Sequence, residues 1–506
     1  MLDAVASSDT PSTATVPTTR PQPSDSPVPA VGPPLRTETG SHDLPVTAAL
    51  AALMRTGWAT PDATSVGAPT PVAQYTSARR DRLSAAYPGE RLIVPSGSLV
   101  RRSNDQHYAF RPHSDYVWLT GDQSSDAVLV LEPVGNRGHE PVLYVRPRAS
   151  REESDEFWRS RTHGEFWAGR RASLAELAAA TGLSTRHLDD LPDALTSGVP
   201  SRVRRGVDPR IDALVDTRPD ADDRLAATLA ELRLVKDGWE IAELRAAVQI
   251  TADGFDDAVR ELDTAVRLGP YGERWIEGTF WRRARYAGND VGYLSIVAGG
   301  AHATTLHWIA GTGELRPGDL LLLDMGAETR SLYTADITRT LPIGGRFTDV
   351  QADLYQLVLD AQSAGIAAVR PGARFRDFHR AAMTVIAHGL ADLGLLPCPV
   401  EQALDEDSTV YRRWTLCSSG HMLGLDVHDC AHARATAYLD GVLEPGQVLT
   451  VEPGLYLQAD DLLVPEELRG IGIRIEDDVL VTDTGNDVLS AQLPREIPAI
   501  HEWLAT

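Results

Sequence analysis

The sequence has almost no lysine. Of its 48 basic residues one is a lysine, Lys236, and the other 47 are arginines. Chemistry that needs a lysine must therefore use Lys236 or be absent. No glycine-rich phosphate loop precedes Lys236 in LRLVKDGWEIAELRAA, which excludes a P-loop, and a Schiff-base role is not expected there. The chain also lacks a G-x-S-x-G motif, which argues against an α/β-hydrolase.

Cysteine and long apolar runs are scarce as well. The cysteines Cys398, Cys417 and Cys430 are too few to form a disulfide framework in 506 residues, which fits a reducing compartment and predicts a cytoplasmic protein. We expect no transmembrane helix, because no run of about 18 apolar residues occurs, and no secretory signal is recognisable. The net charge of −23 repels phosphate backbones, so nucleic acid is not expected as a partner.

Composition divides the chain into three predicted regions. Residues 1–45 are rich in Pro, Ser and Thr and are expected to be a disordered tail, because they cannot bury enough apolar surface. Residues 46–235 read as an α/β domain. It begins with a short helix in 46–58, its strands are RLIVPSG, YVWLTG, DAVLVLEPV and PVLYVRP, and its longer helices span 172–196 and 221–235. This domain has few clustered titratable groups, which predicts a scaffolding or access-shaping role.

Residues 236–506 read as an α+β domain. Helical patterns span 237–263, 270–286, 349–369 and 375–394. The β-rich segments are LLLLDMGAE, SLYTADITRTL, QVLTVEPGLYL and GIRIEDDVLVT. Unlike ordinary core strands, these segments carry acidic residues at their centres.

Four carboxylates lie in these apolar strand patterns: Asp324, Asp336, Glu452 and Glu476. An ionised carboxylate inside an apolar strand is costly unless a cation shares it. With a turn near Thr329–Arg330, the first two acids would face each other across an antiparallel pair, which is unfavourable unless a cation lies between them. Neither Arg330 nor Arg339 can lie between all four acids, so a pair of divalent metal ions is the simpler expectation.

Histidines add candidate nitrogen ligands. His421 and His428 occur in GHMLGLDVHDCAH, and His307 occurs in TTLHWIAG. An oxygen-rich site with one imidazole suits Mn²⁺, Co²⁺, Fe²⁺ or Zn²⁺. Two metal ions about 3.5–4 Å apart can hold a hydroxide that is nucleophilic near neutral pH, and nothing else in the chain offers a comparable nucleophile.

Five motifs in the same order strongly resemble the Xaa-Pro aminopeptidases (aminopeptidase P), which share the pita-bread fold with prolidase, methionine aminopeptidase and creatinase. The motifs are RLIVPSGSLVRRSNDQHYAFRPHSDYVWLTGDQSSDAVLVLEP, TTLHWIAGTGELRPGDLLLLDMGAETRSLYTADITRTLPIGGRFTDVQ, GHMLGLDVHD, LTVEPGLYL and GIGIRIEDDVLVT. The resemblance covers about residues 75–505. It implies an α/β N-terminal domain followed by an α+β pita-bread catalytic domain.

The resemblance also implies the ligands of a dinuclear metal site, most often occupied by Mn²⁺ in this family. Asp336 and Glu476 would bridge both ions, Asp324 would bind one ion, and His421 and Glu452 would bind the other. The chain keeps all five ligands, which argues against the creatinase-like relatives that lose them.

The implied activity is release of the N-terminal residue from peptides with proline second, by attack of the metal-bridging hydroxide on the carbonyl before the proline. Glu452 would shuttle the proton, and His428 would hydrogen-bond the tetrahedral intermediate or the substrate carbonyl. His307 would line the specificity pocket, and Arg474 would contact substrate or hold the ligand carboxylates. Family members tend to form dimers or tetramers, with the N-terminal domain of one subunit near another's site.

One position departs from the family pattern. The family usually has a histidine four residues before the ligand histidine, but here LCSSGHMLG places Cys417 at that position. A thiol with an ordinary pKa near 8.5 is a poor proton shuttle at neutral pH. Two alternatives therefore stay open beside the aminopeptidase: a prolidase that cleaves only Xaa-Pro dipeptides, and a catalytically weak binding module that keeps the fold.

Overall fold

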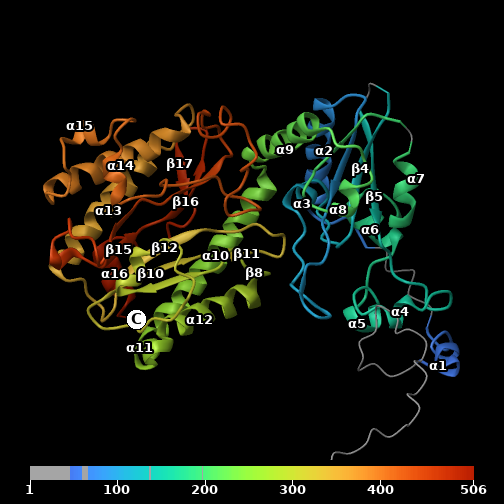
Figure 1. The fold of residues 1–506 in the computed structure, drawn as a ribbon, viewed down its shortest axis with the longest axis horizontal. Coiled ribbons are helices and arrows are strands. Elements are labelled where there is room, and N and C mark those ends of the chain that lie inside the picture. Colours follow the sequence, from blue (N-terminus) through green and yellow to red (C-terminus); the bar gives the residue numbers. More distant parts are fainter. Residues whose placement is uncertain (1–45, 60–66, 136–137, 197, 506) are drawn as a thin grey trace, which may run out of the picture. The chain divides into compact units, whose positions relative to one another are not determined.

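The fold is taken from a computed structural model, which describes residues 46–59, 67–135, 138–196 and 198–505 (Figure 1). The predicted tail over 1–45 lies outside the described residues. The chain divides into a small unit, with described residues 46–59 and 149–170, and a large unit that contains the rest. Within the described ranges, no helix has both the length and the apolar character needed to cross a membrane.

The small unit is a helical cluster built around aromatic rings. It contains α1 (Ala48–Leu53), α4 (Glu156–Arg159) and α5 (Glu165–Ala168), so the short helix predicted within 46–58 is confirmed. Phe157 makes edge-on contacts with Trp58 and Phe166, at centroid distances of 5.2 and 5.9 Å. The Arg151 guanidinium lies over Trp58 and Phe157, a cation–π arrangement.

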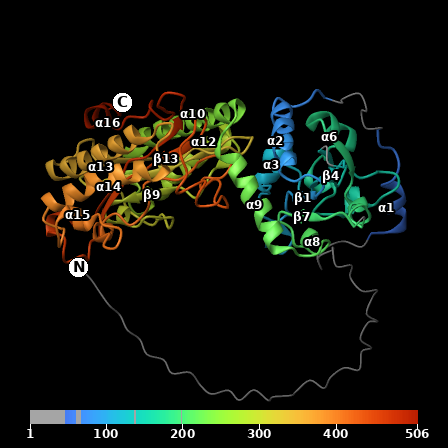
Figure 2. The same ribbon diagram turned by 90° about the horizontal axis from the view of Figure 1, so that it is seen from above.

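The N-terminal part of the large unit is a five-stranded mixed sheet in the order β6-β5-β4-β1-β7. Strands β1, β4 and β7 are labelled in Figure 2. The central strand β4 is antiparallel to both neighbours, whereas β7 and β6 pair parallel to β1 and β5. Alternate residues of β4 pack on opposite sides, Leu129 and Leu131 in one core and Val128 and Val130 in another, so both faces of the sheet are buried. The strands are β1 (Arg91–Pro95), β4 (Val128–Pro133), β5 (His139–Val145), β6 (Ser184–His187) and β7 (Ser201–Val203).

The helices of this part are α2 (Ala73–Ala86), α3 (Ser114–Thr120), α6 (Leu174–Thr181), α7 (Leu191–Ala194), α8 (Pro209–Asp212) and α9 (Pro219–Leu234). A two-stranded hairpin, β2 (Arg101–Ser103) with β3 (Gln106–His107), completes it. The helix predicted over 221–235 and the strands predicted in RLIVPSG, DAVLVLEPV and PVLYVRP are confirmed by α9, β1, β4 and β5.

Two predictions for this part were wrong. The segment YVWLTG is not a strand but most of α3, which His113 caps at its start and Gly121, at φ 68°, ends. All seven residues of α3 are buried, and a short apolar run buried on every side carries no periodicity that separates helix from strand. The single helix predicted over 172–196 is instead α6, then strand β6, then α7, because Gly182, at φ 69°, ends the first helix.

The C-terminal part of the large unit places short strands between two pairs of long helices (Figure 1). The first helix pair is α10 (Gly238–Arg260) and α12 (Gly272–Ala287), and the second is α13 (Asp349–Ala368) and α14 (Phe375–Asp392). Capping boxes begin α10 at Asp237 and α13 at Thr348. All four long helices were predicted, although the first ends earlier and is followed by the short α11 (Leu262–Arg267).

The strands form sheets β12-β10-β9, β11-β8, β13-β16-β17 and β14-β15. Their bounds are β8 (Asp290–Val291), β9 (Ile296–Gly299), β10 (Leu320–Met325), β11 (Ala327–Glu328), β12 (Ile337–Pro342), β13 (Val448–Val451), β14 (Gly454–Leu457), β15 (Ile471–Arg474), β16 (Asp477–Val481) and β17 (Asn486–Val488). Each β-rich segment predicted from the sequence holds strands. The helices α15 (Val400–Ala403) and α16 (Ile497–Trp503) complete the fold. The boundary predicted at residue 235 falls between α9 and α10 and stays a prediction.

A buried ion pair joins the sheets of this part. Arg339 of β12 donates to Asp477 Oδ1 of β16 at 2.7 Å, and both side chains are at most 1% exposed. The same guanidinium donates to the carbonyls of Glu476, Leu493 and Pro494. Arg339 therefore fixes the backbone at Glu476 against β12.

Replacing this arginine should destabilise the protein strongly. We expect Arg339→Met to lower the free energy of unfolding by about 3–5 kcal/mol, because it removes the arginine 2.7 Å from buried Asp477 and leaves the more distant Arg495, at 3.7 Å. Guanidinium unfolding followed by circular dichroism measures the loss. The control is Arg245→Ala, which breaks an exposed pair with Asp487 and should cost at most about 1 kcal/mol. Equal losses for the two variants would contradict this account of Arg339.

Candidate metal centre

Asp324 and Asp336 lie on one antiparallel hairpin, as predicted. Asp324 is in β10, and Asp336 directly precedes β12. The prediction that they face each other directly was wrong: Asp324 is paired with Thr338. The turn of the hairpin is centred on Ser331, one residue later than predicted, so each residue of β10 pairs with a residue two positions further along the chain. Asp324 and Asp336 therefore lie on the same face of the hairpin but diagonally across from each other.

A tyrosine hydroxyl lies between these two acids. Tyr293 Oη is 2.6 Å from Asp324 Oδ1 and 2.5 Å from Asp336 Oδ1. Burial and the two adjacent carboxylates raise the pKa of Tyr293 well above its usual range, so the phenol stays protonated. Because a phenol has one proton, it can donate to only one of the two carboxylates at a time. Asp336 Oδ2 is not held by this phenol and remains available for a cation.

Arg474, the last residue of β15, holds the other side of Asp324. Its Nη2 donates to Asp324 Oδ2 at 2.5 Å, and its Nε and Nη1 donate to Thr338 Oγ1 and Tyr456 Oη. The arginine side chain is 4% exposed. Of the two roles predicted for Arg474, holding a ligand carboxylate matches these contacts, and the substrate contact stays a prediction.

His421, Glu452 and Glu476 converge on the same place from other elements. Glu452 directly follows β13, and Glu476 lies between β15 and β16. His421 Nε2 is 3.3 Å from Asp336 Oδ2 and 3.5 Å from Glu452 Oε1. Ligand atoms of Asp336, His421 and Glu476 all lie within 4.8 Å of one another.

Two features of the donor set fit a divalent cation. Glu476 Oε2 accepts from Thr338 Oγ1 at 2.6 Å, but its Oε1 is buried with no hydrogen-bond partner. His421 Nδ1 lies 3.2 Å from the Met422 carbonyl, and donation there leaves the Nε2 lone pair facing the carboxylates. Carboxylate oxygens with one imidazole nitrogen form a set that Mn²⁺, Fe²⁺, Co²⁺ or Zn²⁺ can occupy.

The pKa shifts of these ligands show that the site carries too little positive charge to balance its carboxylates. Burial and neighbouring acids raise the pKa of Glu476 well above its usual range, and burial raises that of Glu452 to about 7. Burial opposes a charged His421, but its hydrogen bond to Asp336 and the charge of Glu452 raise its pKa to about 9. Without a metal ion, protons must therefore neutralise part of the cluster.

The remaining predicted site residues line one cavity with these ligands. The cavity has a volume of about 430 Å³, and His307, His428 and Cys417 contribute to its wall. The ring centroids of His428 and His421 are 4.3 Å apart. The apolar part of the wall is formed by Leu294, Ile296, Leu306, Ile309 and Val427.

Comparisons with known proteins agree with this geometry. Residues 242–483 match the family model for metallopeptidase family M24, and residues 76–203 match the model for the aminopeptidase P N-terminal domain. Xaa-Pro aminopeptidase 2 of Streptomyces coelicolor is 54% identical over 464 residues, 91% of this chain and 97% of the relative. The chain belongs to metallopeptidase family M24.

More distant members of the family agree. Xaa-Pro aminopeptidase of Escherichia coli is 31% identical, over 84% of this chain and 97% of the relative. The solved structure of proline aminopeptidase P II from Yersinia pestis, also 31% identical, matches with a TM-score of 0.74 over 86% of this chain and 99% of that one. The predicted α/β N-terminal domain and pita-bread catalytic domain are confirmed. So is the prediction of an aminopeptidase, and neither alternative is favoured.

Sequence reasoning missed three groups that support the M24 site: Tyr293, Thr338 and Tyr456. The sequence could have indicated Thr338, because it lies two residues after Asp336 in a strand pattern and so shares its face. No sequence signal indicated Tyr293, since it is 31 residues from Asp324 in sequence and belongs to no motif. The pairings of β9 with β10 and of β8 with β11 bring its segment beside the acids.

Cys417 is the residue that departs from the family pattern. Its Sγ lies 4.0 Å from Tyr456 Oη. Burial and the charge of Glu452 raise the pKa of the thiol above its ordinary value. Cys417 is therefore a neutral thiol at physiological pH.

The metal-free protein should lose stability as the pH rises. In the folded protein Glu452 keeps its proton up to about pH 7, whereas in the unfolded chain it releases the proton near pH 4.5. The contribution of Glu452 to the free energy of unfolding is therefore lost as the pH rises from 4.5 to about 7. The contribution of His421 is complete below pH 6.5 and is lost as the pH passes 9. Metal ions bind the deprotonated ligands, so Mn²⁺ should raise Tm more at about pH 8 than at about pH 5.5.

Scanning calorimetry after dialysis against EDTA, with and without added Mn²⁺, measures this difference. His421→Gln should reduce the effect of Mn²⁺, whereas His432→Gln, on an exposed side chain, should leave it unchanged. A Tm increase that is equal at the two pH values would show that these protonated ligands are not where the metal binds.

Proposed function

We propose that this M24 aminopeptidase releases the N-terminal residue from peptides that have proline in the second position. The convergence of Asp336, His421 and Glu476 ligand atoms within 4.8 Å, beside Asp324 and Glu452 in one cavity, carries the proposal. The name of its 54% identical relative supports the substrate class. An Xaa-Pro bond is a tertiary amide of restricted shape, so its cleavage calls for a dedicated pocket.

The proposed metal ligands are Asp324, Asp336, His421, Glu452 and Glu476, and the proposed ions are two Mn²⁺. Asp336 and Glu476 would bridge both ions, Asp324 would bind one, and His421 and Glu452 the other. The unpartnered Glu476 Oε1 and the orientation of His421 Nε2 support this assignment. Such a pair, when bound, supplies a nucleophilic hydroxide from water near neutral pH.

The other side chains receive roles from their positions. Glu452 lines the same cavity and would take a proton and return it to the leaving amine. Burial and His421 lower the pKa of His428, so its neutral ring can donate to the substrate carbonyl oxygen or the tetrahedral intermediate. His307 and the apolar wall would form the specificity pocket. Arg474 would orient Asp324 and contact substrate.

Two further proposals concern the protein in the cell. We propose a cytoplasmic location, which the three free cysteines support. A homo-oligomer, as a dimer or tetramer, is proposed from the relationship to the family alone.

Substrate length and metal dependence test the activity together. We expect hydrolysis of an Xaa-Pro-Xaa tripeptide that disappears after EDTA treatment and returns with Mn²⁺. Glu476→Gln should lower kcat by more than about 100-fold, because changes that only touch a ligand's neighbours already cost 10–100-fold. Glu467→Gln, which neutralises an exposed acid in the short 3-10 helix Glu466–Leu468, is the matched control and should keep full activity. Cleavage of Xaa-Pro dipeptides alone would identify a prolidase, and bound metal without hydrolysis would identify a binding module.

We expect Cys417 to limit the kcat of peptide hydrolysis. We expect Cys417→His to raise kcat on the tripeptide by about 10-fold, since a positioned imidazole that exchanges protons contributes at least this much. Cys417→Ser is the control of similar size and should not raise kcat. If Cys417→His leaves kcat unchanged or lowers it, the cysteine does not limit catalysis and the pocket is adapted to the thiol.

A further inference from the structure

The segment that carries His428 has little regular structure of its own. Residues 423–431 lie outside every helix and strand that the structure describes. Their conformation therefore depends on contacts with other parts of the chain. Cys430, two residues after His428, has φ 61°, a left-handed conformation that costs free energy in a residue other than glycine.

One carboxylate before His428 and one after it are anchored by cations. Asp426, two residues before His428, accepts from Arg233 Nη2 at 2.9 Å. Asp429, the residue after it, contacts Arg233 and accepts from Lys236 Nζ at 3.0 Å. The single lysine of the chain is thus fully buried behind the segment, where it also donates to the Arg233 carbonyl.

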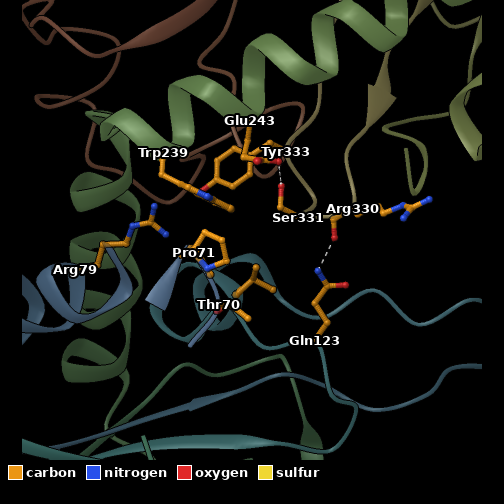
Figure 3. A pocket seen from close by; sticks show the side chains of 12 residues that line it. Thr70, Pro71, Arg79, Gln123, Trp239, Glu243, Arg330, Ser331 and Tyr333 are labelled. Carbon is orange, nitrogen blue, oxygen red and sulfur yellow. Dashed lines mark hydrogen bonds between the residues drawn. The ribbon is translucent and has the colours of Figure 1, made fainter. Parts of the chain in front are cut away.

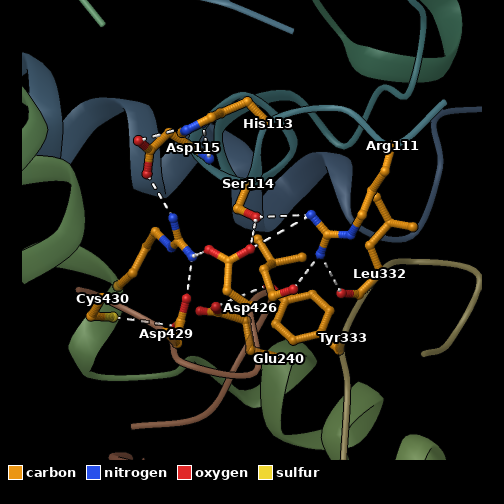
Figure 4. Close-up of polar contacts among 12 residues, drawn as sticks. Arg111, His113, Ser114, Asp115, Glu240, Leu332, Tyr333, Asp426, Asp429 and Cys430 are labelled. Atoms are coloured by element: carbon orange, nitrogen blue, oxygen red, sulfur yellow. Dashed lines mark hydrogen bonds and ion pairs between the residues drawn. The ribbon is translucent and has the colours of Figure 1, made fainter. Parts of the chain in front are cut away.

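The N-terminal domain contacts the same segment directly. Ser114 Oγ donates to Asp426 Oδ1 at 2.5 Å, and Arg111 lies 3.6 Å from the same oxygen and bonds to the Leu425 carbonyl. Figure 4 shows both side chains directed at Asp426. Burial opposes ionisation of Asp426, but Arg233 and Arg111 outweigh it and lower its pKa to about 2, so Asp426 is ionised throughout the neutral range.

Arg111 also contacts the hairpin that carries Asp324 and Asp336. Its Nε donates to Glu328 Oε2 of β11 at 2.6 Å, and its Nη2 donates to the Leu332 carbonyl at 3.5 Å. One guanidinium therefore holds the hairpin of the metal centre and the segment of His428 at a fixed spacing.

We propose that Arg111 and Ser114 of the N-terminal domain are positioning residues that place His428 in the active site. The inference rests on the proposed catalytic contact of His428. It gives the N-terminal domain a part in catalysis, although neither residue lines the cavity of the metal centre.

Kinetic measurements can show whether Arg111 and Ser114 position His428 or only hold the two domains together. We expect Arg111→Met to lower kcat by about 100-fold with KM almost unchanged, because a displacement of about 1 Å in a catalytic group can cost this much. Ser114→Ala, which removes one oxygen, should lower kcat by less. Because Asp426 stays ionised, the effect should be constant between about pH 6 and 9.

The matched control is Gln123→Ala. Gln123 Nε2 donates to the Arg330 carbonyl at 2.8 Å beside a separate cavity of about 350 Å³, which residues of both domains line (Figure 3). This variant removes a hydrogen bond between the same two domains away from His428. It should leave kcat unchanged.

A double-mutant cycle decides the question. Adding Arg111→Met or Ser114→Ala to His428→Ala should cause no further loss of kcat if both act through the histidine. Losses that multiply, or an equal loss in Gln123→Ala, would overturn the proposal. If Arg111→Met does not fold, the cycle with Ser114→Ala carries the test. Full activity in His428→Ala would instead refute the proposed catalytic role of His428. Full activity in the Arg111 and Ser114 variants, with low activity in His428→Ala, would refute only their positioning role.

Discussion

The accumulation of buried negative charge at one point is the constraint on which the rest of this structure depends. Asp324, Asp336, Glu452 and Glu476 come together beside Arg474 and His421, although like charges at this spacing repel strongly in a medium of low polarity. Only divalent cations or protons can balance them. The fold must hold these side chains together against their repulsion, and it does so with fixed donors: Tyr293 to the hairpin acids, Thr338 to Glu476, and Arg474 to Asp324.

The supports of the site reach far from the metal ligands. Arg339 is buried against Asp477 and fixes the backbone beside Glu476, so the strand that presents a ligand is itself held by an ion pair. Arg233 and Lys236 likewise hold the segment that presents His428. The arginine-rich composition matches this use, because a guanidinium can bond several acceptors at once where an ammonium acts as a point charge.

Much of the catalytic domain was predictable because its signals are local. The helices at α10, α12, α13 and α14 have caps and long amphipathic patterns, and acids within apolar strands are rare enough to be noticed. Predictions were wrong where a short apolar run is buried on all sides, as in α3, or where one glycine interrupts a helical pattern, as at Gly182. The N-terminal domain was expected to hold few clustered titratable groups, and this was also wrong: Asp115 lies between Arg204 and Arg233, beside Arg111 and Asp426. Asp115 is 89 and 118 positions from Arg204 and Arg233 in sequence, so no spacing rule could group them.

The sequence alone determined the family, the long helices and the set of candidate ligands, since these depend on which residues are present and on their spacing along one strand or helix. The tertiary structure decided the rest. It set the diagonal register of Asp324 and Asp336, placed Tyr293 between them, directed Arg474 to a carboxylate, and brought Arg111 and Ser114 to the segment of His428. The physical reason is that hydrogen bonds and ion pairs act over a few ångströms in space, whatever the separation of their partners along the chain.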